Sequence, residues 1–434
     1  MKYNDRPRVS HQTEALYFAK NATGYHFGNY VHQDSKCELR NLHATGCSGN
    51  QVRQLHRIQA VDFNYKINWT NVEQFGQGER LDFMMLTSPD VNIDFEYLLA
   101  DGYNENVLNF YVDGKHQALR NHINNTEAQV GSNFFMLTSD DTRNAIGTDL
   151  SKTPETKRIV GIGNAFLSQY AIMAEVDKLP RARVSFEAFN VRSYTGVCNL
   201  PLPSINPRYD CMKSELLDSD LRFSLPDPEQ GILYEKVSGM EDIYIKPGST
   251  ALRPGDIRVD LQNRGLTTEQ LSGFDHQGSY NRGAASIQGF AINVPFGNTR
   301  MHRVGTHLEW TRAVNFPINI EVQIDAIVGE LKQGGFSAEY CSEPFDIKII
   351  LHDCRCLVDC CKVAVHKKQN MTIEVRGAVL ANEDIVSNIG DNKEVSLRFN
   401  AQMGSIDDEA NGLFISGKSF IPDKPNILAW GVPL

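Results

Sequence analysis

The chain has 434 residues, 41% of them hydrophobic and 22% charged; this composition excludes global disorder, and the length predicts two or three domains. The formal net charge of −10 argues against a protein that binds nucleic acid by neutralising phosphates, because such surfaces are basic. No apolar run is long enough to span a bilayer, and residues 1–25 lack the apolar region of a secretory signal, so we expect a chain without membrane anchoring that is made in a cytoplasm.

After an N-terminal arm at 1–50, apolar and polar residues alternate in segments 61–67 and 91–97, and the same alternation returns at 290–294 and 318–325. A period of two with β-branched and aromatic residues on one side is typical of a half-buried strand in an antiparallel sheet. The apolar sides carry Val61, Phe63, Tyr65, Ile67, Val91, Ile93, Phe95, Tyr97, Phe290, Ile292, Val294, Ile318, Ile320, Val322 and Ile324.

The alternating segments belong to a long internal repeat. With an offset of 227 residues, 58–102 aligns on 285–329 without a gap, so that Phe63 meets Phe290. With an offset of 213 residues, 133–188 aligns on 346–401, again without a gap. Identities within each block are few, but two colinear blocks that share their hydrophobic phase indicate a duplication.

The repeat divides the chain into five parts. The arm at 1–50 precedes a first domain copy at 51–199. A Pro-rich connector at 200–284, with a strand expected around 257–261, leads to a second copy at 285–404. A C-terminal tail occupies 405–434. We therefore expect a mainly β fold.

The polar sides of these strands are rich in Asn, Gln, Asp and Glu, and Lys66 is the only basic residue among them. One interpretation is an ordinary solvated face. The other is a surface past which a polyanion slides without binding, because each added Lys or Arg would strengthen phosphate binding. Both copies also carry a long connection between the paired strands, at 68–80 and at 295–307. Each could be a loop with a contact to make or an extension of the strands.

The order of these patterns resembles a known family. The segments FGQGERLD (75–82), LLADGYNE (98–105) and GIGNAFLSQYAIMAEVDKLPRARVSFEAFNV (161–191), with the echo RGAVLANEDIVSNIGDNKEVSLRFNA (376–401), are similar to the tail tube, or major tail, proteins of long-tailed bacteriophages. The resemblance covers about 58–194 and 285–404. It implies a small β-sandwich or half-barrel with a short flanking helix in each copy, for which 266–271 is one candidate.

The resemblance also implies a place in the virion tail. Sheets of neighbouring domains would join into a barrel around a channel for DNA ejection, and rings would stack through loops. Single-domain members imply a sixfold ring, so a chain with two copies would form a homotrimer with pseudo-sixfold symmetry, assembled in the host cytoplasm. Its partners would be copies of itself, a sheath or baseplate and a terminator. A tail-tip, baseplate or terminator ring of the same fold is the alternative.

The resemblance assigns two sets of residues. The channel wall would contain Asp62, Asn64, Lys66, Asn92, Asp94, Glu96, Asn293, Asn319, Glu321, Gln323 and Asp325. The ring-stacking loops would contribute Trp69, Glu73, Phe75, Arg80, Arg300, His302 and Arg303.

Five of the nine cysteines cluster in the second copy, with one histidine nearby, and three interpretations remain open. Without an export signal, reduced thiols are the default. Disulfides between subunits could form once a virion leaves the cell. A zinc site is the weakest alternative, because the spacing matches none of the common ligand pairs, and we expect no cofactor or metal. The residues concerned are Cys341, His352, Cys354, Cys356, Cys360 and Cys361.

Other motifs give little support to catalysis. Asp94 and Glu96 could mimic a glycosidase carboxylate pair, but they lie on one strand face and the second copy has an amide at the corresponding place, so we expect no enzyme. The run 161–164 lacks the third glycine of a dinucleotide fingerprint and predicts a turn or bulge.

A receptor- or glycan-binding β-sandwich is the remaining alternative. It would present exposed aromatic residues on loops, and the candidates are Trp69, Phe75 and Tyr103.

Overall fold

The computed structural model describes residues 14–19, 31–33, 39–41, 52–123, 131–139, 145, 157–188, 190–195, 200–201, 203, 222–223, 257–263, 286–302, 304, 309, 311–327, 344–353, 368–386 and 394–417. Its fold is mainly β with two short helices, which confirms the predicted class. We call residues 14–195 the first half and residues 257–417 the second half.

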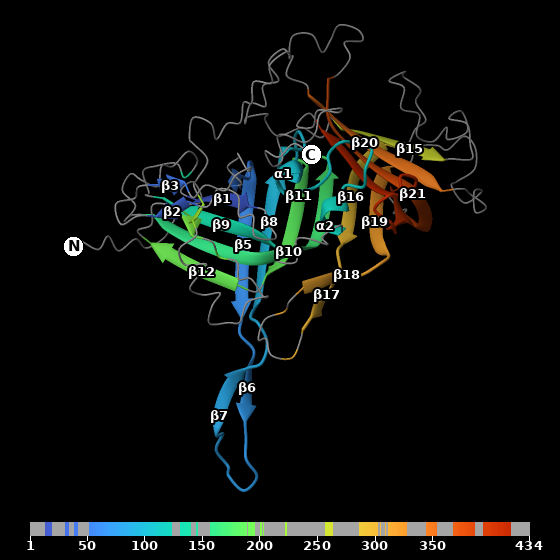
Figure 1. The fold of residues 1–434 in the computed structure, drawn as a ribbon. Helices are drawn as coiled ribbons and strands as arrows, with labels where there is room; N and C mark the ends of the chain where they lie inside the picture. The colour runs from blue at the N-terminus through green and yellow to red at the C-terminus, as the bar shows by residue number, and fades with distance from the viewer. Residues whose placement is uncertain are drawn as a thin grey trace.

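One long antiparallel sheet runs through both halves (Figure 1). In the first half its strands lie in the order β5 (Ile58–Lys66), β8 (Asp90–Leu98), β11 (Arg181–Ala188) and β10 (Arg158–Glu175). The edge of β10 then pairs with the second half, whose strands follow in the order β16 (Ser286–Pro295), β19 (Ile318–Ile327), β22 (Glu394–Met403) and β21 (Lys368–Val386).

The strands β10 and β21 each take part in a second layer as well. The N-terminal part of β10 pairs with β9 (Ser132–Thr138) and β12 (Asn190–Thr195), and β9 pairs with β1 (Glu14–Ala19), which also meets β4 (Val52–Gln54). In the second half, β21 pairs with β20 (Phe345–Asp353) and β23 (Gly412–Gly417), and β20 pairs with β15 (Ile257–Asn263).

The register of the two halves corresponds residue by residue. β10 pairs with β11 and β21 with β22 in the same register at an offset of 213, and each pair has its irregularity at the same place, between Leu167 and Gln169 and between Leu380 and Asn382. Asn164 (φ 59) and Gly377 (φ 71) hold equivalent left-handed positions next to the irregularities that β10 and β21 make with β9 and β20. The run 161–164 therefore lies at a bulge, as predicted.

For the earlier strands the structure differs from the alignment by two residues. Val61 opposite Phe95 corresponds to Phe290 opposite Ile324, which is an offset of 229 and not 227. A shift of two residues keeps every side chain on the same face of a strand, so the hydrophobic pattern alone could not fix this register.

The remaining elements are short. Each half has a two-stranded hairpin, β6 (Trp69–Val72) with β7 (Asp82–Met85) and β17 (Asn298–Met301) with β18 (Thr311–Val314). Two further two-stranded pairs are β2 (Val31–Gln33) with β3 (Leu39–Asn41) and β13 (Leu200–Pro201) with β14 (Arg222–Phe223). The helices α1 (Tyr103–Val107) and α2 (Arg120–Ile123) follow β8, and the helix candidate at 266–271 lies outside the described residues.

Strands also lie in the segments predicted as arm and connector. β1, within the predicted arm, is buried at five of its six positions, and β15 in the connector covers the strand expected around 257–261. β23 lies within the predicted C-terminal tail. No helix in the part of the chain that the structure describes is long and apolar enough to cross a membrane.

The apolar core lies between the long sheet and the second layer. The apolar sides of β8, β16 and β19 are buried there, as the alternation predicts. β5 is different, because Phe63, Tyr65 and Ile67 are exposed. The reason is topological: β5 ends the sheet, and within the described residues β8 is its only neighbour in the long sheet.

Candidate functional site

The polar face of the long sheet carries the predicted channel residues side by side across strands. Asp62 on β5 pairs with Asp94 on β8, which pairs with Ser185 on β11. In the second half, Glu321 on β19 lies between Asn293 on β16 and Asn400 on β22. The polar sides of the predicted strands therefore share one face, and this face continues from one half into the other.

Hydrogen bonds connect neighbouring side chains on this face. Asn92 donates to Asn64 at 3.3 Å, Gln402 donates to Asn319 at 3.3 Å, and Ser185 donates to Asp94. At the junction between the halves, Gln169 on β10 donates to Asn293 on β16 at 2.7 Å. Amide groups fixed in this way present a neutral, regular surface between the carboxylates.

Basic residues are less rare on the polar face than the sequence suggested. Arg183 on β11 and Arg398 on β22 join Lys66 there, because they lie opposite Glu96 and Gln323. Arg181 lies two residues from Arg183 on the same side of β11. Arg181 is neutralised by Glu96 at 2.6 Å. The acidic residues still outnumber the basic ones: they are Asp62, Asp90, Asp94, Glu96, Glu175, Glu187, Glu321, Asp325, Asp384 and Glu394.

The two hairpins extend the strands below the sheet, and the β6–β7 hairpin projects away from the rest of the ribbon (Figure 1). Trp69 lies on strand β6, whereas Glu73, Phe75 and Arg80 lie in the loop between β6 and β7. All four are exposed, and Phe75 is fully so. The predicted long connection at 68–80 is thus partly a strand extension.

The equivalent hairpin of the second half binds back onto the first half. Arg300 lies on strand β17, not in a loop, and forms ion pairs with Asp90 and, at 3.3 Å, with Glu187. Burial opposes ionisation of Asp90, but the hydrogen bonds from Arg300 and Asn68 outweigh it and hold the pKa of Asp90 below its usual value. His302 is exposed at the end of this strand, and Arg303 lies outside the described residues.

Arg312 completes this junction, and sequence reasoning missed it. Its guanidinium is 2.7 Å from Glu309, 3.0 Å from Glu187 and 4.8 Å from the centre of the Phe166 ring. The side chains of Arg312 and Glu309 are each only 1% exposed. We call Asp90, Glu187, Arg300, Glu309 and Arg312 the junction cluster. It joins the β17–β18 hairpin to strands β8 and β11 by ionic contacts.

No protein-family model matches the chain, and no curated protein matches it.

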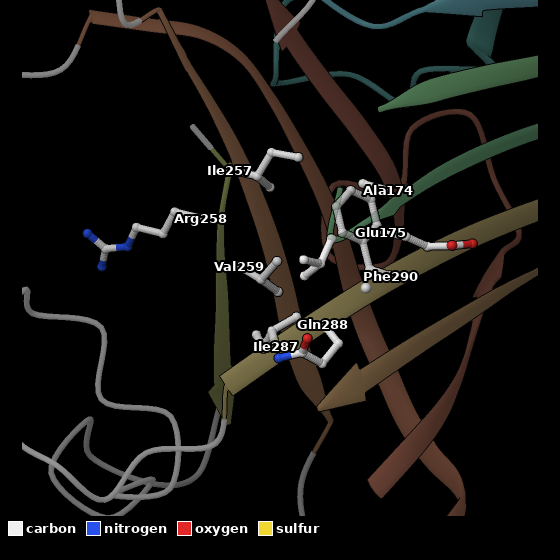
Figure 2. A pocket seen from close by; sticks show the side chains of 10 residues that line it. Ala174, Glu175, Ile257, Arg258, Val259, Ile287, Gln288 and Phe290 are labelled. Carbon is white, nitrogen blue, oxygen red and sulfur yellow. The ribbon is translucent and has the colours of Figure 1, made fainter. Parts of the chain in front are cut away.

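A small pocket lies at the far end of the same junction, where β10, β15 and β16 meet (Figure 2). It measures about 270 Å³, and apolar side chains including Ile257, Val259, Ile287 and Phe290 face it. Arg258 points away from it and pairs with Asp260 at 2.7 Å. The pocket has no convergent set of polar groups that could orient a ligand.

The remaining sequence candidates fall in different places. Among the described residues there is no cluster of three or more His, Cys, Asp or Glu that could hold a metal ion. Tyr103 is buried in α1, so the prediction that it is an exposed aromatic residue for glycan binding is wrong. All five candidate cysteines lie outside the described residues: Cys341, Cys354, Cys356, Cys360 and Cys361. For His352, in β20, only the backbone is described.

Proposed function

We propose that this chain is a structural subunit of a phage tail tube, in which copies join edge to edge into a ring around a channel for DNA. The observation that carries the proposal is the β10–β16 junction. There the edge of one half pairs with the edge of the other through seven registered positions, from Gln169 opposite Pro295 to Glu175 opposite Gly289.

Strand edges equivalent to these two lie unpaired at the two ends of the long sheet. β21 is the equivalent of β10, and β5 is the equivalent of β16. The C-terminal part of β21 pairs with β22 along one edge, and β5 pairs with β8 along one edge. Within the described residues the other edge of each has no strand partner. An open strand edge is a template for pairing with another chain, and closing a ring removes it.

The exposed apolar residues of β5 support this pairing. Phe63 and Tyr65 correspond to Ile292 and Val294 on β16 at the offset of 229. Tyr65 is 59% exposed, whereas Val294 is completely buried at the junction inside the chain. A second copy placed with its β21 on β5, in the register of β10 on β16, would set Asn382 opposite Lys66 and Asp384 opposite Asn64.

The matched registers support the view that the halves are two copies of one domain. Six such domains, the number implied by the resemblance to tail tube proteins, require three chains. The polar face would then line the channel, since the opposite face is covered by the second layer. Its excess of carboxylates over basic groups would keep DNA phosphates from binding tightly during passage.

Negative-stain microscopy and light scattering of the full chain test this proposal. We expect rings of three chains with a central channel, and hollow rods if the rings stack. Replacement of Phe63 by Glu should leave a folded monomer, because the side chain is already partly exposed in one chain but would be buried at the seam. A wild-type chain that stays monomeric at high concentration would overturn the proposal. Rings that never stack would favour a terminator or tail-tip ring of the same fold.

A further inference from the structure

The two hairpins hold equivalent places, but their chemistry differs. Position 312 in β18 corresponds to 83 in β7, because Asn71 pairs with Phe83 as Arg300 pairs with Arg312. Two of the three charged residues that the second hairpin uses at the junction are thus replaced by uncharged ones in the first hairpin: Asn71 stands for Arg300 and Phe83 stands for Arg312. The third, Glu309, corresponds to Arg80, whose guanidinium lies 5.1 Å from the centre of the Phe83 ring.

The surface that the hairpin contacts also carries fewer charges in the second half than in the first. In the first half, the β17–β18 hairpin meets Asp90, Glu187 and Phe166. The equivalent positions in the second half are Asn319, Asn400 and Val379, given the matched registers of β19, β22 and β21. Two carboxylates are thus replaced by amides, and an aromatic ring is replaced by an aliphatic side chain.

Exposure shows which contacts are still unmade in one chain. Arg312 and Phe166 are both 8% exposed, because each covers the other. Their counterparts Phe83 and Val379 are 47% and 54% exposed. A large apolar residue exposed on each of two surfaces, at positions whose equivalents are in contact, is explained if a second copy brings the two surfaces together.

We propose that the β6–β7 hairpin binds the second half of a neighbouring copy, with Phe83 on Val379 and Asn71 next to Asn319 and Asn400. This inference rests on the proposed ring and adds to it a chemical difference between its two kinds of seam. The hairpin contact inside a chain depends on ion pairs, whereas the Phe83–Val379 contact between chains is apolar. Salt weakens ion pairs more than it weakens apolar burial, so salt should weaken the hairpin contact between chains less than an ionic contact at the same place.

The proposed contact can be tested by introducing the charged residues of the contact inside the chain at the equivalent positions of the contact between chains. Phe83→Arg places a cation against Val379 without a carboxylate, and the association of full-length chains, measured by sedimentation velocity, should weaken by about tenfold or more. The neighbouring Met84→Arg is the matched control, because strand alternation puts Met84 on the opposite side of the same hairpin.

The double variant Phe83→Arg with Asn400→Glu also introduces a carboxylate, at the position equivalent to Glu187, that can pair with the new arginine as Glu187 pairs with Arg312. The double variant should associate again, and its association should weaken between about 0.1 M and 1 M salt more than that of the wild type does. If wild-type chains form no ring, the proposed function itself fails, and this inference with it. If wild-type rings form but Phe83→Arg associates as tightly as Met84→Arg, or Asn400→Glu restores nothing, the ring stands and the contact proposed here is wrong.

Discussion

Glu105 has a carboxyl group that is enclosed in the core of the first half, where two tyrosine hydroxyls of the long sheet donate hydrogen bonds to it. It lies on α1, is 2% exposed, and accepts hydrogen bonds from Tyr97 at 2.8 Å and from Tyr170 at 3.3 Å. Burial raises its pKa above the usual value, although the Tyr97 hydrogen bond acts in the opposite direction. The folded chain therefore holds this proton more tightly than the unfolded chain does.

This group should make stability depend on pH. Because its pKa is raised in the folded state, its contribution is fully present below the usual Glu pKa and is lost as pH rises through the folded value. We expect Glu105→Gln to remove this fall, so that the variant gains stability relative to wild type from pH 4 to pH 8 in denaturant titrations. Glu105→Ala should instead cost about 1–3 kcal/mol for each tyrosine hydroxyl left without an acceptor. Parallel pH profiles for wild type and Glu105→Gln would contradict the assignment.

At the scale of elements, the junction cluster contains a buried ion pair within the β17–β18 hairpin, Arg312 with Glu309, and the same Arg312 guanidinium reaches Glu187 of the first half. Removing only Arg312, as Arg312→Leu, leaves the buried carboxylate of Glu309 with only its longer contact to Arg300, at 3.9 Å, and should destabilise the chain by up to about 3–5 kcal/mol. The double variant Arg312→Leu with Glu309→Leu removes both charges and should recover most of that loss. Chemical denaturation of the two single variants and the double variant measures the coupling. Additive losses would show that the two groups do not stabilise each other.

The alternation of apolar and polar residues predicted the strands well, because burial of one face imposes a period of two that is visible in a short segment of sequence. It placed 91–97 and 318–325 in strands and their apolar sides in the core. It could not distinguish an offset of 227 from one of 229, since both preserve the faces. Nor could it distinguish β5, an edge strand with Phe63 exposed, from buried strands of the same pattern.

The junction cluster was not predictable for a different reason. In the sequence, Arg312 and Glu309 look like ordinary charges next to a loop, and Glu187, the second carboxylate that pairs with Arg312, is far away along the chain. Only the pairing of β10 with β16 brings them together. Two other pairings, β8 with β11 and β19 with β22, bring Arg183 and Arg398 onto the polar face, where the four alternating segments contain only Lys66.

At the scale of the whole molecule, the polar face makes a prediction about DNA release. Asp62→Lys with Asp94→Lys would place two cations on the proposed channel wall of each chain. Virions assembled with this variant should release their genome several-fold more slowly in an ejection assay, because each added cation strengthens phosphate binding. Asp407→Lys with Glu409→Lys, the same charge change on the exposed loop between β22 and β23, is the control. Unchanged ejection by the first variant would mean that Asp62 and Asp94 do not face the channel.

The two longest strands have a mechanical consequence. β10 and β21 each run without interruption from the second layer into the long sheet, with a bulge where they cross from one to the other. An extended backbone hydrogen-bonded on both sides bends little along its length, so tilting one end of such a strand must displace the other. Any widening of the long sheet would therefore rotate β9 and β12 with β10, and β20 and β23 with β21. In the proposed ring, a deformation of the outer layer would therefore be transmitted to the channel wall along the continuous backbones of β10 and β21.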